Sequence, residues 1–120
     1  MMLVMSQRKI NILEQKIQKT QEKLLALGPI RPGSISKQYN ICGNPNCRCK
    51  DPDNPKKHGP YYNLSYTWKG RGKTEFVSKD RLQIVKSQIR DYKKMKRLTE
   101  EWIEFSIELA SLQKEAAKKG

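Results

Sequence analysis

The sequence lacks any long hydrophobic run, and its apolar content is low. Hydrophobic residues make up 36% of its 120 positions, which is below the usual share in globular domains. No stretch approaches the ~20 apolar residues of a membrane span. The opening segment MMLVMSQRKI reaches charged residues too early for the apolar core of a signal peptide. We therefore expect one cytoplasmic domain with a modest core and no membrane contact.

Cysteine and histidine are also scarce, with three cysteines and one histidine in the chain. An odd number of cysteines does not suit a secreted disulfide framework, and thiols stay reduced inside cells. A single histidine leaves little for acid–base catalysis. The sequence also shows no acid triad and no glycine-rich phosphate loop ahead of a helix. It therefore predicts no enzyme and no small-molecule substrate.

Acidic residues are the third scarcity: 12 Asp and Glu stand against 25 Lys and Arg, for a net charge of +13. The excess is uneven, since residues 31–81 hold eleven basic and four acidic residues, a net of +7. A basic patch on a small domain is typical of a protein that binds a polyanion, most often nucleic acid. The alternative is a basic surface that serves only solubility.

The scarce metal ligands all lie in one short segment. Four residues separate Cys42 from Cys47, one separates Cys47 from Cys49, and eight separate Cys49 from His58. Three thiolates and one imidazole form a set that suits a closed tetrahedral zinc site. Zinc brings no redox chemistry, so we expect structural Zn²⁺ and no catalysis. Thiols without metal, or an iron–sulfur or redox role, are the alternatives.

Two long helices are predicted on either side of a β segment. In residues 3–27 the heptad positions are apolar apart from two polar sites, which indicates a coiled-coil helix; these positions are Leu3, Ser6, Ile10, Leu13, Ile17, Thr20, Leu24 and Leu27. Gly28 and Pro29 end it. A second helix begins after Ser78, a favourable N-cap, and carries an apolar stripe as far as Ala116. Three-residue steps around Met95 allow a break near residues 95–99.

The segment between the helices predicts short strands. SISKQYNI leads into the cysteine loop, and YYNLSYTW alternates so that Tyr62, Leu64, Tyr66 and Trp68 share one face, which we expect to be the core. KGRGK forms a turn and TEFVS the return strand of a β-hairpin.

The predicted fold class is α+β, mostly helical, with a small zinc-bound β-hairpin head between two long helices. We expect residues 1–28 to form a coiled-coil-like helix, residues 33–78 the zinc-binding loop and hairpin, and residues 79–118 the C-terminal helix. The helices would pair as an antiparallel hairpin within one chain or as a dimeric coiled coil. A homodimer or another coiled-coil partner is therefore expected.

Basic residues at three places are the candidates for nucleic-acid contact: the cysteine loop, the hairpin tip and the first half of the last helix. They are Arg48, Lys50, Lys56 and Lys57; Lys69, Arg71 and Lys73; and Lys86, Arg90, Lys93, Lys94 and Arg97.

The pattern C-G-x-P-x-C-x-C followed by H-G-P-Y-Y resembles a family of small, uncharacterised prokaryotic proteins, over roughly residues 33–98 of this chain. Its members are often associated with mobile elements or transposases. The resemblance implies a metal site and a prokaryotic cytoplasmic protein, associated with the nucleoid if it binds DNA.

Together these observations predict a zinc-stabilised nucleic-acid-binding protein, with DNA favoured over RNA, that acts as an accessory or regulatory factor of a mobile element. The alternative is a non-enzymatic oligomerisation or adaptor protein whose coiled-coil helices bind a protein partner.

Overall fold

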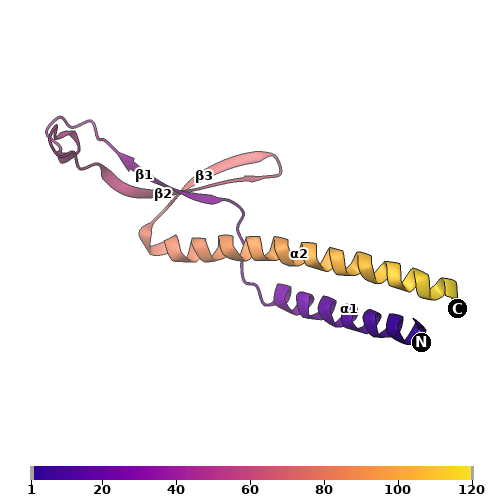
Figure 1. The fold of residues 1–120 in the computed structure, drawn as a ribbon. Helices are drawn as coiled ribbons and strands as arrows, with labels where there is room; N and C mark the ends of the chain where they lie inside the picture. The colour runs from indigo at the N-terminus through magenta and orange to yellow at the C-terminus, as the bar shows by residue number, and fades with distance from the viewer. Residues whose placement is uncertain (1, 120) are drawn as a thin grey trace. The chain divides into compact units, whose positions relative to one another are not determined.

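The computed structural model describes residues 2–119, in which a small three-stranded antiparallel sheet lies between two long helices in sequence (Figure 1). Helix α1 spans Met2–Leu25 and helix α2 spans Lys79–Lys119. Strands β1, β2 and β3 span Ser34–Asn40, His58–Trp68 and Arg71–Val77, and a short 3-10 helix, η1, spans Arg48–Lys50. The chain forms two compact units. We call Ile30–Arg90 the sheet unit, and the segments up to Pro29 and from Asp91 onward the helical unit.

Helix α1 buries its predicted heptad positions. Ile10, Leu13 and Thr20 are buried, and the remaining described heptad positions are half-buried; these are Ser6, Ile17, Leu24 and Leu27. The side chain of Leu3 lies outside the described residues. The Thr20 hydroxyl donates to the Lys16 carbonyl at 2.8 Å, so this buried polar position has a hydrogen-bond partner. The heptad pattern therefore identifies the buried face of α1 correctly.

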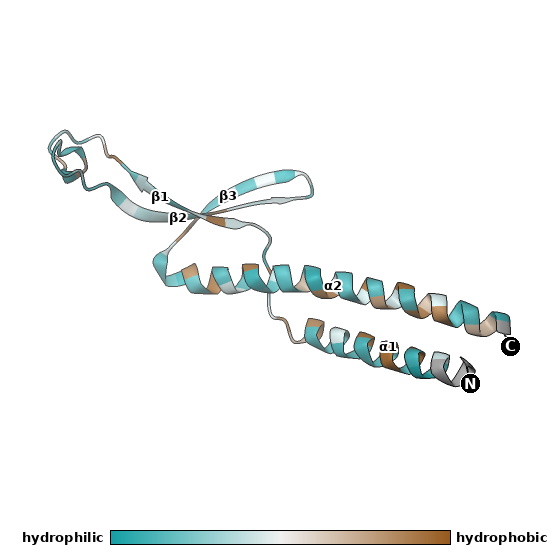
Figure 2. Ribbon diagram, in the orientation of Figure 1, coloured by the Kyte–Doolittle hydropathy of each residue, from teal (hydrophilic) through white to brown (hydrophobic). Residues whose placement is uncertain are grey.

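Helix α2 runs without interruption from Lys79 to Lys119, so the break considered near residues 95–99 is absent. At that point the Thr99 hydroxyl donates to the Met95 carbonyl at 2.7 Å, inside the continuous helix. The apolar stripe of α2 serves both units in turn. Its first part is buried in the sheet unit, and from Tyr92 onward it belongs to the helical unit. Figure 2 shows hydrophobic bands recurring along both helices.

In the sheet, β2 lies between β1 and β3 and is antiparallel to both. The hairpin turn between β2 and β3 is shorter than predicted, because Trp68 pairs directly with Arg71 and only Lys69 and Gly70 form the turn. Both turn residues have positive φ, 52° and 78°, which is the geometry of a type I′ turn. Lys73, predicted within the turn, therefore lies on strand β3.

The core of the sheet unit lies where α2 covers one face of the sheet. Its members are Leu64, Val77, Leu82, Val85 and Ile89, with Ile35, Tyr62 and Tyr66 packed against them. The expectation that Trp68 joins this core is wrong, since its side chain is 59% exposed. Val77 leads directly into α2, so the helix covers that end of the hairpin, whereas Trp68 stands at the opposite end beside the turn.

Among residues 2–119, no helix has both the length and the apolar character needed to cross a bilayer.

Candidate metal centre and basic surface

The segment Cys42–Lys57, which we call the metal loop, connects β1 to β2. It is built from successive tight turns. The N–H of Cys47 donates to the Asn44 carbonyl at 3.2 Å, and the N–H of Lys50 donates to the Cys47 carbonyl at 3.0 Å. Almost all of its side chains are exposed, and Cys49 is its one fully buried residue, at 2% exposure. The loop therefore has no apolar core of its own.

The three cysteines of this loop come together with His58, the first residue of β2. Their ligand atoms all lie within 4.8 Å of one another. Cys42 Sγ is 3.6 Å from Cys49 Sγ, and Cys47 Sγ is 3.0 Å from His58 Nε2. Sulfurs bonded to one tetrahedral zinc at about 2.3 Å would stand about 3.8 Å apart. The four side chains predicted from the sequence thus form a cluster that could hold a metal ion.

Hydrogen bonds within the cluster favour a thiolate at Cys42. The backbone amide of Asn44, followed by His58 and Cys47, lowers the pKa of the Cys42 thiol to about 6. The N–H of Cys42 donates to Cys49 Sγ at 3.4 Å, although burial raises the pKa of Cys49. Metal ligation requires the deprotonated form of cysteine, so a cation would supply the charge that the buried Cys49 thiolate needs.

The position of His58 is fixed by strand β2, which begins at this residue. The residue pairs with Asn40 of β1 at a register shift. Gly59 follows with φ of 130°, and a Cβ there would lie 2.8 Å from the Gln38 carbonyl oxygen. The sequence H-G therefore brings an imidazole to the loop at a point where β1 and β2 approach too closely for a larger residue.

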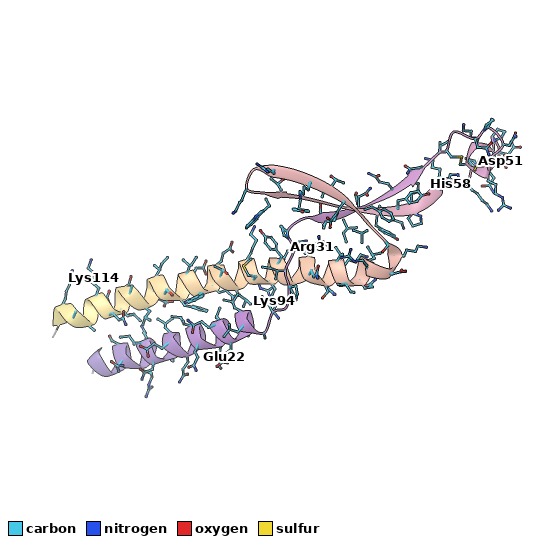
Figure 3. The ribbon with its side chains drawn as sticks, turned by 180° about the vertical axis from the view of Figure 1, so that it is seen from behind. Glu22, Arg31, Asp51, His58, Lys94 and Lys114 are labelled. Carbon is cyan, nitrogen blue, oxygen red and sulfur yellow. The ribbon has the colours of Figure 1, made fainter. Side chains whose placement is uncertain are left out.

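The two aspartates of the loop, Asp51 and Asp53, form a turn and are not metal-ligand candidates in this structure. Asp51 Oδ1 accepts the N–H of Asp53 at 3.0 Å, which is an Asx turn. Neither belongs to the ligand cluster, whose fourth member is His58. Figure 3 shows Asp51 and His58 at the loop end of the sheet.

All of the candidate nucleic-acid contacts named from the sequence have exposed side chains. They lie in the metal loop, at the hairpin end and along α2; the hairpin-end group is Lys69, Arg71 and Lys73. Among the described residues, the one salt bridge joins Arg31 to Glu75, so it involves none of the candidates. Their charges are available to a ligand.

The hairpin end also forms a cleft of about 530 Å³, lined by Tyr66, Trp68, Lys69, Arg71 and Lys73. Trp68 lies opposite Arg71, and Tyr66 lies opposite Lys73, across the β2–β3 pair. Each aromatic ring therefore has a cation on the neighbouring strand. Of the basic residues that the sequence assigned to the hairpin tip, Lys69 lies in the turn and Arg71 and Lys73 lie on β3, and the sequence did not place Trp68 among them.

Sequence reasoning missed the face of the sheet opposite α2, which we call the outer face. Strand register assigns ten residues to it: Ser34, Ser36, Gln38, Tyr61, Asn63, Ser65, Thr67, Gly72, Thr74 and Phe76. None is charged, although 31% of the chain is. The alternation of Asn63, Ser65 and Thr67 was visible in the sequence. The pairing of β1 with β2, which doubles the polar surface, was not.

Searches of curated proteins and of solved structures returned no match. A family model, described as a domain of unknown function (DUF6788), matches residues 7–87. This range includes most of α1, the whole sheet with its metal loop, and the start of α2. The match agrees with the resemblance to an uncharacterised family. The chain therefore belongs to the family of the domain of unknown function DUF6788.

Proposed function

We propose that this protein is a non-enzymatic, zinc-stabilised nucleic-acid-binding protein with a preference for DNA over RNA. The observation that carries the proposal is the hairpin-end cleft, which is lined by three exposed cations and two aromatic side chains. Cations of this kind contact phosphates and aromatic rings stack on bases, and nucleic acid offers both groups on one ligand.

Zinc is the metal that fits the loop. The donor set of three sulfurs and one imidazole nitrogen favours zinc over hard cations such as Mg²⁺ or Ca²⁺, which take oxygen ligands. Because the protein provides four ligands within 4.8 Å of one another, a tetrahedral ion has no open position for substrate. The role we assign to zinc is therefore to fold the metal loop.

The proposal is tested by the salt dependence of binding. A triple variant Lys69→Ala/Arg71→Ala/Lys73→Ala removes the cations of the cleft, and a matched variant Lys9→Ala/Lys19→Ala/Lys23→Ala removes three exposed cations from α1. Each lost phosphate contact lowers the slope of log K against log salt by about 0.9 on duplex DNA. We expect the slope to fall by about 2 to 3 for the cleft variant and to stay unchanged for the α1 variant. Absence of binding at about 50 mM salt, or equal losses in both variants, would contradict the proposal.

For the helices, we propose pairing as an antiparallel hairpin within one chain. Lys16 Nζ of α1 lies 5.6 Å from the ring centroid of Phe105 in α2. Ile10 and Leu13 of α1 and Leu98 of α2 are buried in the same unit. A monomeric mass in solution with unchanged helix content would support intra-chain pairing, whereas unfolding of α1 upon dilution would support a dimeric coiled coil.

A second candidate function, as an oligomerisation or adaptor protein, has one observation in its favour. Ile103 and Ile107 lie one helical turn apart on α2 and are 54% and 63% exposed. Spacing of four residues places them on one face, where they could contact a protein partner. The double variant Ile103→Ser/Ile107→Ser would then reduce self-association or partner binding while nucleic-acid binding remained.

The biological setting that we propose is a mobile element, in which the protein acts as an accessory or regulatory factor. This rests on the sequence resemblance to proteins associated with such elements and on the basic charge. Recovery of element DNA in immunoprecipitates of the protein from its native cells tests it, and recovery of DNA without such enrichment would argue against it.

A further inference from the structure

The outer face of the sheet is polar but uncharged, and this composition is unusual for a solvent-exposed surface of such a basic protein. Most of its residues carry a hydroxyl or an amide, and the exceptions are Gly72 and Phe76. Ser36, Ser65, Thr67 and Thr74 are exposed, and charged residues make up 31% of the chain. A face that served only solubility would be expected to carry Lys or Glu.

We propose that this outer face lies in the major groove of double-stranded DNA and recognises base pairs there. The inference rests on the proposed nucleic-acid binding but uses a different surface from the cleft, because strand register places Trp68, Arg71 and Lys73 on the α2-facing side of the sheet. It adds the ligand class, duplex DNA, and the mode of recognition, direct contact with base edges.

The chemistry of the face matches that of base edges. Asn and Gln bind adenine, Ser and Thr bind any base, and the methyl of Thr or the ring of Phe contacts the methyl of thymine. Asn63 Nδ2 donates to Gln38 Oε1 at 3.1 Å across β1 and β2. Within the hydrogen bonds of the described residues, this leaves Asn63 Oδ1 as an acceptor and Gln38 Nε2 as a donor. An acceptor and a donor side by side are what the N6 and N7 atoms of adenine require.

Two further features of the sheet could contact the methyl group of thymine. Phe76 lies beside Asn63 in the strand register and is 65% exposed. A depression of about 400 Å³ is lined by four outer-face residues, Ser65, Thr67, Gly72 and Thr74, together with Gly33, Tyr66 and Lys73, which do not belong to that face. The missing side chain at Gly72 leaves room there for a methyl group, and the neighbouring hydroxyls supply hydrogen bonds.

The dimensions of the sheet also fit. Three strands spaced about 4.8 Å apart are about 10 Å across from the first to the last, and the major groove is about 12 Å wide. The 11 residues of β2 extend for about 33 Å. Basic side chains follow at both ends of this strand: Lys69 in the turn, and Lys56 and Lys57 before His58. Phosphates along the groove would therefore meet cations on either side of an uncharged face.

The test is a selection of binding sites from a library of random duplexes with the zinc-loaded full chain, followed by measurements on three variants. Gln38→Ala/Asn63→Ala removes the amide pair, and Thr67→Val removes a hydroxyl with little change of shape. Gln15→Ala/Gln18→Ala, on exposed positions of α1, is the matched control. Circular dichroism and zinc content establish that each variant is folded.

We expect the wild-type chain to select a defined sequence and to prefer it over a scrambled duplex by at least about 100-fold. Loss of the amide pair should lower this preference by about tenfold or more. The affinity of this variant for the scrambled duplex should stay within about twofold of the wild-type value, and the salt slope should not change. Thr67→Val should change the preference at a different base pair, so it provides an independent test if the amide variant does not fold. The control should match the wild type.

The outcomes separate the two proposals. If the chain binds all duplexes alike, prefers single-stranded DNA, or keeps its preference after both outer-face changes, the base-recognition inference is wrong while the proposed function stands. If it prefers RNA, the inference and the proposed preference for DNA are both wrong, and only nucleic-acid binding stands. If the wild-type chain binds no nucleic acid, both proposals fall.

Discussion

The middle of strand β2 and the metal loop that precedes the strand are stabilised in different ways. Where α2 covers the sheet, Leu64 is fully buried and packs with Val77, Val85 and other apolar side chains. In the metal loop, Cys49 is the one fully buried residue, and Figure 2 shows the loop as mostly hydrophilic. Apolar contacts with a helix hold the first region, and the second has in their place a cluster of three cysteines and one histidine that could hold a metal ion. A small domain with a modest core often needs such an ion.

The largest effect that this comparison predicts is the loss of metal binding. Structural zinc sites in small domains bind with about 10–16 kcal/mol at neutral pH, and Cys49→Ser removes the buried ligand of the cluster. We expect zinc content, measured by native mass spectrometry, to fall from one ion per chain to near zero.

The same change should expose the loop to trypsin, which cleaves after Lys and Arg, while the Leu64 region stays folded. Asp51→Asn is the matched control, because it keeps Oδ1 as an acceptor for Asp53 and lies outside the cluster. Equal zinc loss in the control would make Asp51 a ligand, and full zinc content in Cys49→Ser would refute the four-ligand site.

The next effect concerns the apolar core around Leu64. Leu64→Ala should lower the free energy of unfolding of the sheet unit by about 2–5 kcal/mol, because it leaves a cavity in the core. Ile84→Ala, at a position on α2 that is 57% exposed, should change it by less than about 0.5 kcal/mol. Urea titration followed by Trp68 fluorescence in a Trp102→Phe background measures both. Similar values for the two variants would show that the apolar cluster does not hold the sheet.

Gly59 joins the two regions, and Gly59→Ala should affect both. The new Cβ would lie 2.8 Å from the Gln38 carbonyl oxygen at a φ of 130°, a strain of about 1–3 kcal/mol. We expect zinc affinity to weaken by about tenfold in competition with a chromophoric chelator, because His58 shifts with the strand. Gly43→Ala, where a Cβ would have no atom within 4 Å, is the control. An equal loss of zinc affinity in both variants would show that the close approach at Gly59 does not position His58.

The smallest effect belongs to the hairpin turn. Lys69 has a φ of 52°, a conformation that Asn tolerates better than Lys. Lys69→Asn should therefore stabilise the hairpin by about 0.5 kcal/mol and lower the salt slope of DNA binding by about 0.9. Lys57→Asn, in the metal loop, should lower the slope without stabilising the hairpin. A Lys69→Asn variant that is less stable than the wild type would contradict this account of the turn.

Much of the local structure could be predicted from the sequence. The ligand cluster was recognisable because all of its scarce residue types fall within 17 positions, from Cys42 to His58. The buried face of α1 followed from its heptads, and Leu64 from its place in an alternating strand. These features depend on residues close together in the sequence, so spacing alone is informative.

The features that depend on distant partners were harder to predict. The three-residue steps around Met95 indicated a possible break, but α2 is continuous. The apolar stripe of α2 packs in the sheet unit as far as Ile89 and belongs to the helical unit from Asp91 onward. The spacing of its apolar residues can therefore change at that point without a break in the helix. Trp68 was placed in the core because periodicity shows which face a residue shares but not how far along the strand the helix extends.

The central claim, that the sheet of this chain binds DNA, is tested most directly by nuclear magnetic resonance. Spectra of the ¹⁵N-labelled, zinc-loaded chain would be recorded while duplex DNA is added at low salt. We predict that the largest shifts fall on the side-chain amides of Gln38 and Asn63 and on the backbone amides of Thr67 and Thr74. Shifts confined to α1 and to α2 beyond Asp91, with the outer face unchanged, would contradict the account.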